Sequence, residues 1–450
     1  MRYIHSKIIN QTLKLTLPIS FARILEVGMT TVDTIMIGHL GKNALATVGI
    51  AIPLWNILAV FFMGTLFALT PILGREIRHR KFDEAAKVLL AAKSICLIFF
   101  LCTVAIFLIS GFLFRLLSQP DDLIRFATYF LFVMLFGVPS FLFNQILRQI
   151  FEVYKKPGVT VMISCVGFLL NLVGNYMLIY GKWGVPALGI YGSALSTGIC
   201  WLWMFLAHLW FLKILKLQFS PAKILFSFSL GSKTSIRSFL NQGLPLGAGV
   251  FTEVSFFVFT AWMIGQLGKL PLASHHIAIN LASITFMLAI GTSSAATILI
   301  SQTTGLYQAA RIFLFGFSGF VIIVTFMTLS AIIFICFPRF LVNLYTNDLD
   351  ILNFAPKLLW LGGLFQIFDG LQCVGFGILR GIGASKMALR NTLVSYWLIG
   401  ASSGIFLGSV LGFGAQGYWV GINIGLATAA CLHYWSFRLK LCDIRLTKTL

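Results

Sequence analysis

The stretch LPISFARILEVGMTTVDTIMIGHLGK, residues 17–42, decides the fold because a related stretch, LPLGAGVFTEVSFFVFTAWMIGQLGK, returns at residues 244–269. A constant shift, from 17 to 244, aligns Leu-Pro at the start and Gly-x-Leu-Gly-Lys at the end of both stretches. A second match joins residues 189–192 to residues 414–417 at nearly the same shift. The chain is therefore predicted to contain two copies of one unit, and the copies cover most of its length.

The composition predicts that both copies lie in a membrane. Of 450 residues, 58% are hydrophobic and 10% are charged, and the mean hydropathy is +0.94. Apolar runs exceed the roughly 20 residues that a helix needs to cross a bilayer. The predicted fold is an all-α integral membrane protein with about 12 transmembrane helices in two pseudo-symmetric six-helix lobes. The spans are expected near residues 14–37, 45–73, 88–117, 123–147, 158–181, 186–212, 239–265, 272–302, 312–338, 351–379, 388–411 and 415–437.

The distribution of basic residues predicts the orientation. Most of the 33 Lys and Arg residues fall on the side of the N-terminus, and the opposite side holds only Lys42, Arg115, Arg125, Lys182, Lys269, Arg339 and Lys357. By the positive-inside rule, both termini are cytoplasmic in the plasma membrane, which for a bacterium is the inner membrane. The formal charge of +20 follows from this bias, so it indicates no nucleic-acid partner. The N-terminal segment lacks a cleavage site after a short apolar core and is not expected to be a signal peptide.

An even number of spans in each copy makes the two lobes parallel repeats about an axis along the membrane normal. The N-terminal lobe is predicted at residues 1–212 and the C-terminal lobe at residues 239–450. The basic segment 213–238 between them, which contains Pro221 and Gly231, is the predicted cytoplasmic linker.

Duplicated helical bundles with polar groups at mid-depth are typical of secondary transporters. The sequence contains no GxxxxGK[ST] phosphate-binding motif and no soluble segment large enough for a nucleotide-binding domain. An ion gradient is therefore the expected energy source. None of the eight cysteines forms a C-x-x-C pair, so neither a zinc site nor a disulfide framework is expected, and no cofactor is predicted.

Four carboxyl groups lie in the predicted spans: Glu26, Asp33, Glu253 and Asp369. An ionisable group at membrane depth is costly, so function is the default explanation. Glu26 has a structural alternative, because Arg23 precedes it by three residues on the same helix and can pair with it. Asp33 lies near a span end, where it could also reach the outer water. Glu253 and Asp369 lie further from span ends and lack a basic neighbour in sequence.

The residues in these spans resemble those of the multidrug and toxic compound extrusion (MATE) transporters. The resemblance rests on Leu17-Pro18, on the run from Thr31 to Gly41, on Gly243-Leu244-Pro245 leading to Glu253, and on Asp369 followed by the run from Gly377 to Gly381. It covers nearly the whole chain and is nearest to the bacterial NorM branch. The resemblance implies export of small organic cations or other amphipathic compounds from the bilayer, coupled to Na⁺ or H⁺, by alternating access. A duplicated chain that contains its own two-lobed pathway is expected to function as a monomer.

Residue by residue, the resemblance assigns cation coupling to Glu253 and Asp369, and a polar cluster to Asp33, Asn171 and Asn175. The i, i+4 spacing of the two asparagines places both amides on one helix face, where they can bind Asp33 or a cation. The family pattern often has a tyrosine four residues before the acid of the tenth span, and here that position is Phe365.

The carboxyl groups suit either coupling ion. A carboxyl group in a low-dielectric cavity loses solvation of its charged form and can therefore bind a proton near neutral pH. Carboxylate and amide oxygens equally suit Na⁺, a hard cation. The sequence leaves both ions open, as well as the lobe that binds the ion.

Two other function classes compete with export. A lipid-linked oligosaccharide flippase of the same superfamily would need several basic residues in its cavity, and Arg23 is the only clearly intramembrane cation in the predicted spans. An intramembrane enzyme would need a close pair such as Asp33 and Asp369, or an acid beside His275 and His276, and the sequence indicates neither. The chain is not expected to be an enzyme.

Overall fold

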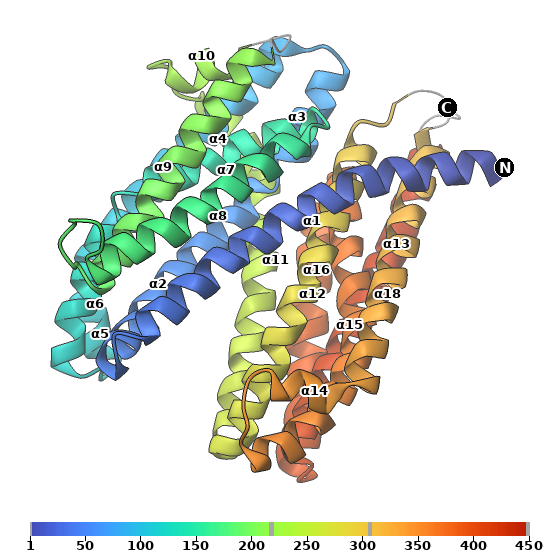
Figure 1. The fold of residues 1–450 in the computed structure, drawn as a ribbon. Coiled ribbons are helices and arrows are strands. Elements are labelled where there is room, and N and C mark those ends of the chain that lie inside the picture. Colours follow the sequence, from blue (N-terminus) through green and yellow to red (C-terminus); the bar gives the residue numbers. More distant parts are fainter. Residues whose placement is uncertain (1, 216–219, 305–307, 447–450) are drawn as a thin grey trace. The chain divides into compact units, whose positions relative to one another are not determined.

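The computed structural model describes residues 2–215, 220–304 and 308–446, and these are helical with short connections and no strands (Figure 1). The helices of the first half are α1 (Arg2–Gly38), α2 (Lys42–Leu66), α3 (Leu69–Arg78), α4 (Phe82–Leu108), α5 (Ser110–Leu116), α6 (Asp121–Met134), α7 (Val138–Val153), α8 (Pro157–Tyr180), α9 (Ile190–Ile214) and α10 (Pro221–Phe226). Those of the second half are α11 (Lys233–Gly265), α12 (Lys269–Ser301), α13 (Gln308–Cys336), α14 (Pro338–Asn343), α15 (Leu349–Ile382), α16 (Ser385–Leu393), the π-helical η1 (Val394–Ala401), α17 (Ser402–Ile405), the π-helical η2 (Phe406–Val410) and α18 (Gly414–Leu446).

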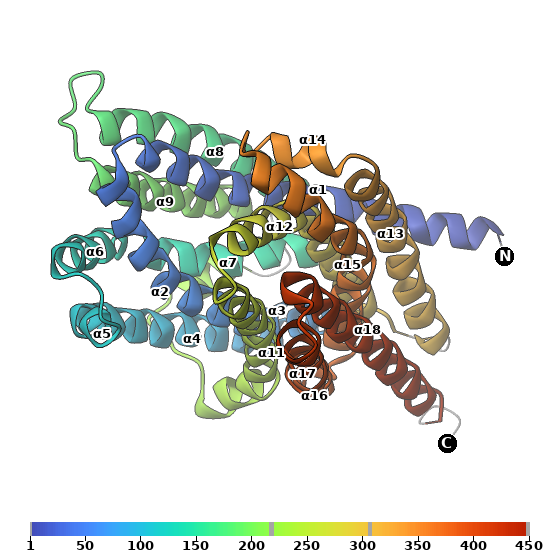
Figure 2. The same ribbon diagram turned by 90° about the horizontal axis from the view of Figure 1, so that it is seen from below.

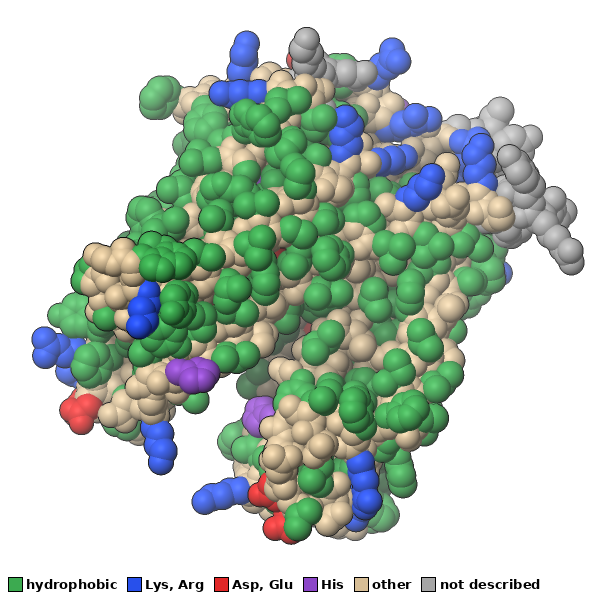
Figure 3. Space-filling model, viewed as in Figure 1, with side chains coloured by type: hydrophobic (Ala, Val, Ile, Leu, Met, Phe, Trp, Pro, Cys, Tyr) green, Lys and Arg blue, Asp and Glu red, His purple; other side chains and the backbone are tan. Residues whose placement is uncertain are grey.

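Ten helical segments in the described residues are long and apolar enough to cross a membrane, and the pair α6 and α7, bent by 49°, adds an eleventh. The twelfth predicted span falls on α18. The predicted all-helical membrane fold is confirmed. On the face drawn in Figure 3, hydrophobic side chains cover the sides of the helices and charged side chains gather at helix ends.

The chain forms two compact units. The first unit is Ala22–Gly243, and the second is Leu244–Leu450 together with Met1–Phe21. Helix α1 thus contributes its beginning to the second unit and its remainder to the first. The predicted lobes, residues 1–212 and 239–450 with the linker 213–238, stay a prediction; the compact units differ from them mainly in the place of residues 1–21.

The backbone repeats as the sequence does. Gly41 (φ 108°, ψ 176°) precedes α2, and Gly268 (φ 118°, ψ 177°) precedes α12. Gly189 (φ 56°) precedes α9, and Gly414 (φ 58°) is the first residue of α18. These backbone conformations are open to glycine and strained for other residues. Identical turns at matched positions show that the two copies share a local structure as well as a sequence pattern.

Within the first unit, α8 and α9 pack side by side, as Figure 2 shows. Within the second unit, α15 packs against α12, α13 and α18. Asp348 caps the N-terminus of α15, and its carboxylate accepts hydrogen bonds from the backbone N–H groups of Asp350 and Ile351.

Close approach of glycines joins α18 to the segment of η1, α17 and η2. A Cβ atom on Gly425 would lie 3.1 Å from Cα of Gly400, and one on Gly421 would collide with the backbone of Gly404. Small residues at such crossings let membrane helices pack closely. This packing helps to place Tyr396, which lies in η1.

Candidate functional site

Helices α11 and α15 bring two carboxyl groups of the second unit to one amide. Gln372 Nε2 donates a hydrogen bond to Glu253 Oε1 (2.8 Å) and another to Asp369 Oδ1 (3.2 Å). Asp369 and Gln372 are three residues apart and therefore share a face of α15. We call these three residues, together with Tyr396, the acid pair site.

The fourth member of this site comes from a π-helical segment. Tyr396 in η1 donates a 3.5 Å hydrogen bond to Glu253 Oε1, and its ring stacks on Phe256 at 5.3 Å between centroids. Asp369, Gln372 and Tyr396 are at most 3% exposed. Departures from α-helical geometry are frequent at functional sites because they reorient side chains. Here the departure coincides with the hydroxyl that reaches Glu253.

No ion pair in the described residues involves Glu253, Asp369 or Asp33. The acid pair site therefore joins two carboxyl groups, an amide and a phenol without a fixed positive charge. Burying an unpaired carboxylate is expensive, so the site favours a bound proton or another small cation. It also offers several oxygen atoms, the ligands that a hard cation prefers.

The second predicted cluster assembles inside the first unit. Asp33 of α1 is 8% exposed, and its Oδ1 accepts hydrogen bonds from Asn171 Nδ2 (3.1 Å) and from Asn175 Nδ2. Thr197 of α9 donates to Asp33 Oδ2 at 3.1 Å. Asn175 Oδ1 is buried without a hydrogen-bond partner in the described part of the chain. The structure thus brings together the three predicted residues and leaves a buried acceptor oxygen beside the carboxylate.

Glu26 lies in a different environment from the other three acids. Its Oε2 accepts from Arg23 Nη1 at 3.1 Å, and its Oε1 accepts from Arg148 Nη1. Arg148, which is 1% exposed, also lies 3.4 Å from Glu152 through Nε. The charges of two arginines and two glutamates therefore balance. This is the ion pair with Arg23 that the sequence offered as the structural alternative for Glu26, extended by Arg148 and Glu152.

The expectation that Arg23 is the only intramembrane cation is wrong. Lys93 and Arg380 are buried in helices that are long and apolar enough to cross a membrane, and Arg148 is buried in α7, which is long enough only together with α6. Hydrophobicity windows conceal them because a few charges hardly change the mean of a long apolar segment. They are held by local partners: Lys93 by the carbonyls of residues 227 and 229, and Arg380 by Thr297 Oγ1 at 2.9 to 3.0 Å.

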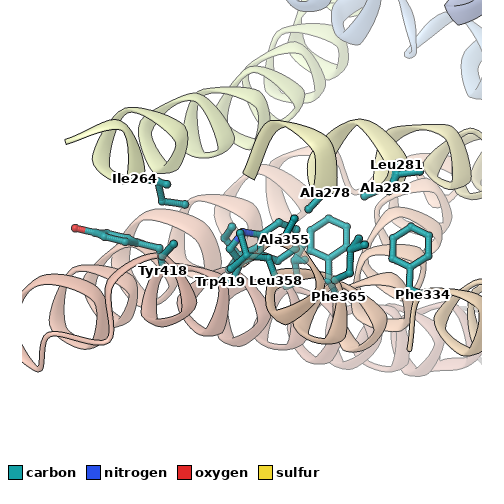
Figure 4. Close-up of a cluster of buried hydrophobic side chains, with 14 of the residues drawn as sticks. Ile264, Ala278, Leu281, Ala282, Phe334, Ala355, Leu358, Phe365, Tyr418 and Trp419 are labelled. Carbon is teal, nitrogen blue, oxygen red and sulfur yellow. The ribbon is translucent and has the colours of Figure 1, made fainter. Parts of the chain in front are cut away.

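Phe365 is 3% exposed and packs within an apolar cluster (Figure 4). Its ring lies edge-on to Phe257 at 6.0 Å and tilted to Trp419 at 5.7 Å. Phe257 follows Glu253 by four residues in α11, and Phe365 precedes Asp369 by four residues in α15. Each ring therefore lies one turn from its acid on the same face of its helix. The ring pair therefore forms an apolar wall beside the acid pair site.

Sequence reasoning missed Gln372, Tyr396, Thr197 and Arg148. The spacing from Asp369 to Gln372 is a usable signal, since residues three apart share a helix face. The other three contact their carboxylates from distant helices, and no local pattern indicates such contacts.

Buried carboxyl groups on the helices of a duplicated, all-helical bundle are typical of secondary transporters, a class of integral membrane protein. The chain belongs to the MatE family, whose model matches residues 18–177 and 245–406. It is 29% identical over 425 residues to the multidrug resistance protein MdtK of Yersinia pseudotuberculosis serotype O:1b (strain IP 31758), covering 93% of each chain. MdtK of Photorhabdus laumondii is equally similar.

Solved structures show the same fold. A MATE protein crystallised in a bent conformation superposes with a TM-score of 0.88 at 17% identity, covering 99% of both chains. The eukaryotic MATE transporter AtDTX14 gives a TM-score of 0.83 at 18% identity with the same coverage.

Proposed function

We propose that this protein is an antiporter that exports amphipathic, often cationic, organic compounds in exchange for Na⁺ or H⁺. The MatE family match and the similarity to proteins named for multidrug resistance support export. The observation that supports ion coupling is the acid pair site. There Gln372 bridges Glu253 and Asp369, and neither acid has a basic partner in the described part of the chain.

Exchange follows from charge at this site. A bound proton or Na⁺ cancels one negative charge of the site, so the loaded site attracts an organic cation less strongly. The unloaded site carries negative charge and attracts that cation. Because the two ligands compete for one electrostatic environment, binding of the ion favours release of the compound. Phe257, a partly buried ring one helical turn from Glu253, offers apolar surface beside the charge, which suits a flat organic cation.

The Asp33 cluster is a second place for the coupling ion. Asp33 supplies negative charge, and Asn175 Oδ1 supplies a buried oxygen without a partner. Because the two clusters belong to different units, variants at each test them separately.

A flippase is less well supported. Phosphate-bearing cargo requires free positive charge, but Arg148 is paired with Glu26 and Glu152. We further propose that both termini face the cytoplasm, and this orientation follows from the distribution of Lys and Arg.

The test is uptake of a fluorescent organic cation into proteoliposomes, with a sodium gradient or a proton gradient imposed separately. We expect one gradient to drive transport, and Glu253→Gln with Asp369→Asn to abolish the driven component. The exposed Asp350→Asn, on the same helix as Asp369, is the matched control and retains transport. Transport by the double variant at the rate of the unaltered protein would refute ion coupling at this site. If neither gradient drives transport in the unaltered protein, the antiport proposal itself fails.

A further inference from the structure

The cavity at the end of α5 and the beginning of α6 lies far along the sequence from every buried carboxylate described above. It has a volume of about 930 Å³, within the range of small-molecule sites. Its charged lining residues are Arg115, Asp121 and Arg125. Figure 1 places α5 and α6 at the end of the first unit where α1 meets α2.

The three charges are available to a ligand. Arg115 Nε lies 3.7 Å from the Asp121 carboxylate, and both side chains are more than 70% exposed. Such an exposed, long ion pair contributes little stability, so a ligand can replace it at small cost. Arg125 lies over the Tyr129 ring, 5.9 Å from its centroid. Neither guanidinium is committed to a buried partner, in contrast to Arg148.

An apolar groove adjoins this cavity. Apolar residues of α2, of α5 and of the turn after α5 line it: Gly49, Ile50, Pro53, Leu54, Ile57, Leu113, Phe114, Leu116 and Leu117. Gln119 lines both the cavity and the groove. Ser118, with φ of 54°, turns the chain between the two helices, and Gln119 Nε2 donates to the Leu117 carbonyl at 3.1 Å. This turn places a charged cavity and an apolar groove side by side.

We propose that the cavity and the groove bind one phospholipid with a phosphoethanolamine headgroup. The phosphate pairs with Arg115 and Arg125, because guanidinium groups match phosphate oxygens in geometry and charge. The primary ammonium group donates to the Asp121 carboxylate. An acyl chain lies in the groove between α2 and α5, which buries apolar surface. An organic cation is a poorer match, since two of the three charges are positive.

The lining also predicts headgroup selectivity. Phosphatidylcholine has the same phosphate, but its quaternary ammonium has no N–H to donate to Asp121. Phosphatidylglycerol has no positive group at all. Phosphatidylethanolamine alone among these three offers both a phosphate for the arginines and an N–H donor for Asp121.

Lipid retention by the purified full-length protein tests the proposal. Delipidated protein is incubated with each of the three lipids, all with identical acyl chains, and bound lipid is counted by native mass spectrometry. We expect phosphatidylethanolamine to be retained about three- to tenfold more than either other lipid, as one or two partly exposed charge-assisted hydrogen bonds would give. Arg115→Gln with Arg125→Gln should lower the retention of all three lipids, because all three carry the phosphate. Asp121→Asn should remove the preference over both phosphatidylcholine and phosphatidylglycerol, because the ammonium group of phosphatidylethanolamine then has no carboxylate to bind.

The matched control is Lys182→Gln, an exposed basic residue of the same unit that does not line the cavity. It should leave retention unchanged. Retention that is independent of headgroup, preference for phosphatidylglycerol, or an equal loss in Lys182→Gln would each overturn the proposal. Displacement of the lipid by equimolar glycerophosphoethanolamine, which lacks acyl chains, would overturn the role of the groove.

Discussion

Glu26 and Glu253 occupy matched positions in the two copies, at the shift that aligns residues 17 and 244, yet their surroundings are opposite. Glu26 is held between Arg23 and Arg148, whereas Glu253 receives an amide and a phenol. A guanidinium supplies a permanent positive charge that belongs to the protein itself. Gln372 and Tyr396 supply none, which is why we propose that a bound ion provides the positive charge at Glu253.

The difference shows how a duplicated protein can divide its tasks. One copy neutralises its acid with arginine and gains a fixed ion-pair network. The other keeps its acid free of fixed cations in the described residues, which the proposed exchange of ions requires. The comparison predicts that changes at Glu26 affect mainly stability and changes at Glu253 affect mainly transport.

The largest expected effect comes from breaking the network at Arg148. Arg148→Met removes the shared partner of Glu26 and Glu152 and should lower the free energy of unfolding by about 3 to 5 kcal/mol, as for other buried pairs that lose one member. Thermal unfolding in detergent measures this loss. Addition of Glu152→Gln restores the charge balance, since Arg23 still pairs with Glu26, and should recover part of the stability. Equal stability of Arg148→Met and the unaltered protein would remove the structural half of the comparison.

Glu253→Gln tests the other half. We expect ion-driven transport to fall by about 100-fold, equivalent to about 2.7 kcal/mol. The thermal unfolding temperature should change little, because a glutamine keeps the size of the side chain and hydrogen-bonding capacity. Glu26→Gln should show the reverse pattern, with lower stability and retained transport per folded molecule. The comparison is wrong if both glutamates affect transport and stability to the same degree.

Gln372→Met sharpens the comparison by identifying the ion. The amide N–H groups favour the charged carboxylates, so their loss favours protonation. If protons drive transport, the pH of half-maximal activity should move upward by about one unit, for about 1.5 kcal/mol of lost hydrogen bonding to charged groups. If sodium drives transport, the apparent affinity for sodium should instead fall by about tenfold, because an amide oxygen is lost. Transport measured across pH and sodium concentration separates the two, and an unchanged response to both would exclude Gln372 from the site.

The smallest expected effect is the difference in unfolding free energy between two glycine variants at matched turns, which should be close to zero. Gly41→Ala and Gly268→Ala each place a Cβ atom at a strongly positive φ in matched turns, at a cost of about 1 to 3 kcal/mol. Neither Cβ would meet another atom within 4 Å, so backbone strain alone sets the cost. The two variants should therefore differ in unfolding free energy by less than about 0.5 kcal/mol. A larger difference would show that the copies have diverged in their backbone as well as in their polar contacts.

Much of the fold could be predicted because membrane helices follow local rules. Apolar length predicted the spans, and the repeated segments predicted two copies of one unit, which agrees with the matched backbone of Gly41 and Gly268. The π-helical η1 was not predicted, since it leaves no periodic signal in composition.

The polar contacts were only partly predictable. Asn171 and Asn175 could be placed on one face from their spacing alone, and Arg23 could be matched to Glu26 for the same reason. Arg148 could not, because it is 122 residues from Glu26 and its helix position gives no sign of its partner.

The sequence by itself determined that this protein is a duplicated helical membrane protein with four acids at unusual depth, because hydrophobic length and repeat spacing act along the chain. Only the tertiary structure decided which acids carry a fixed counter-charge. That outcome depends on which distant side chains reach each carboxylate, and helix packing sets those contacts over many tens of residues. Two glutamates at equivalent positions thus acquired different chemistry from Arg148 in one copy and from Gln372 and Tyr396 in the other.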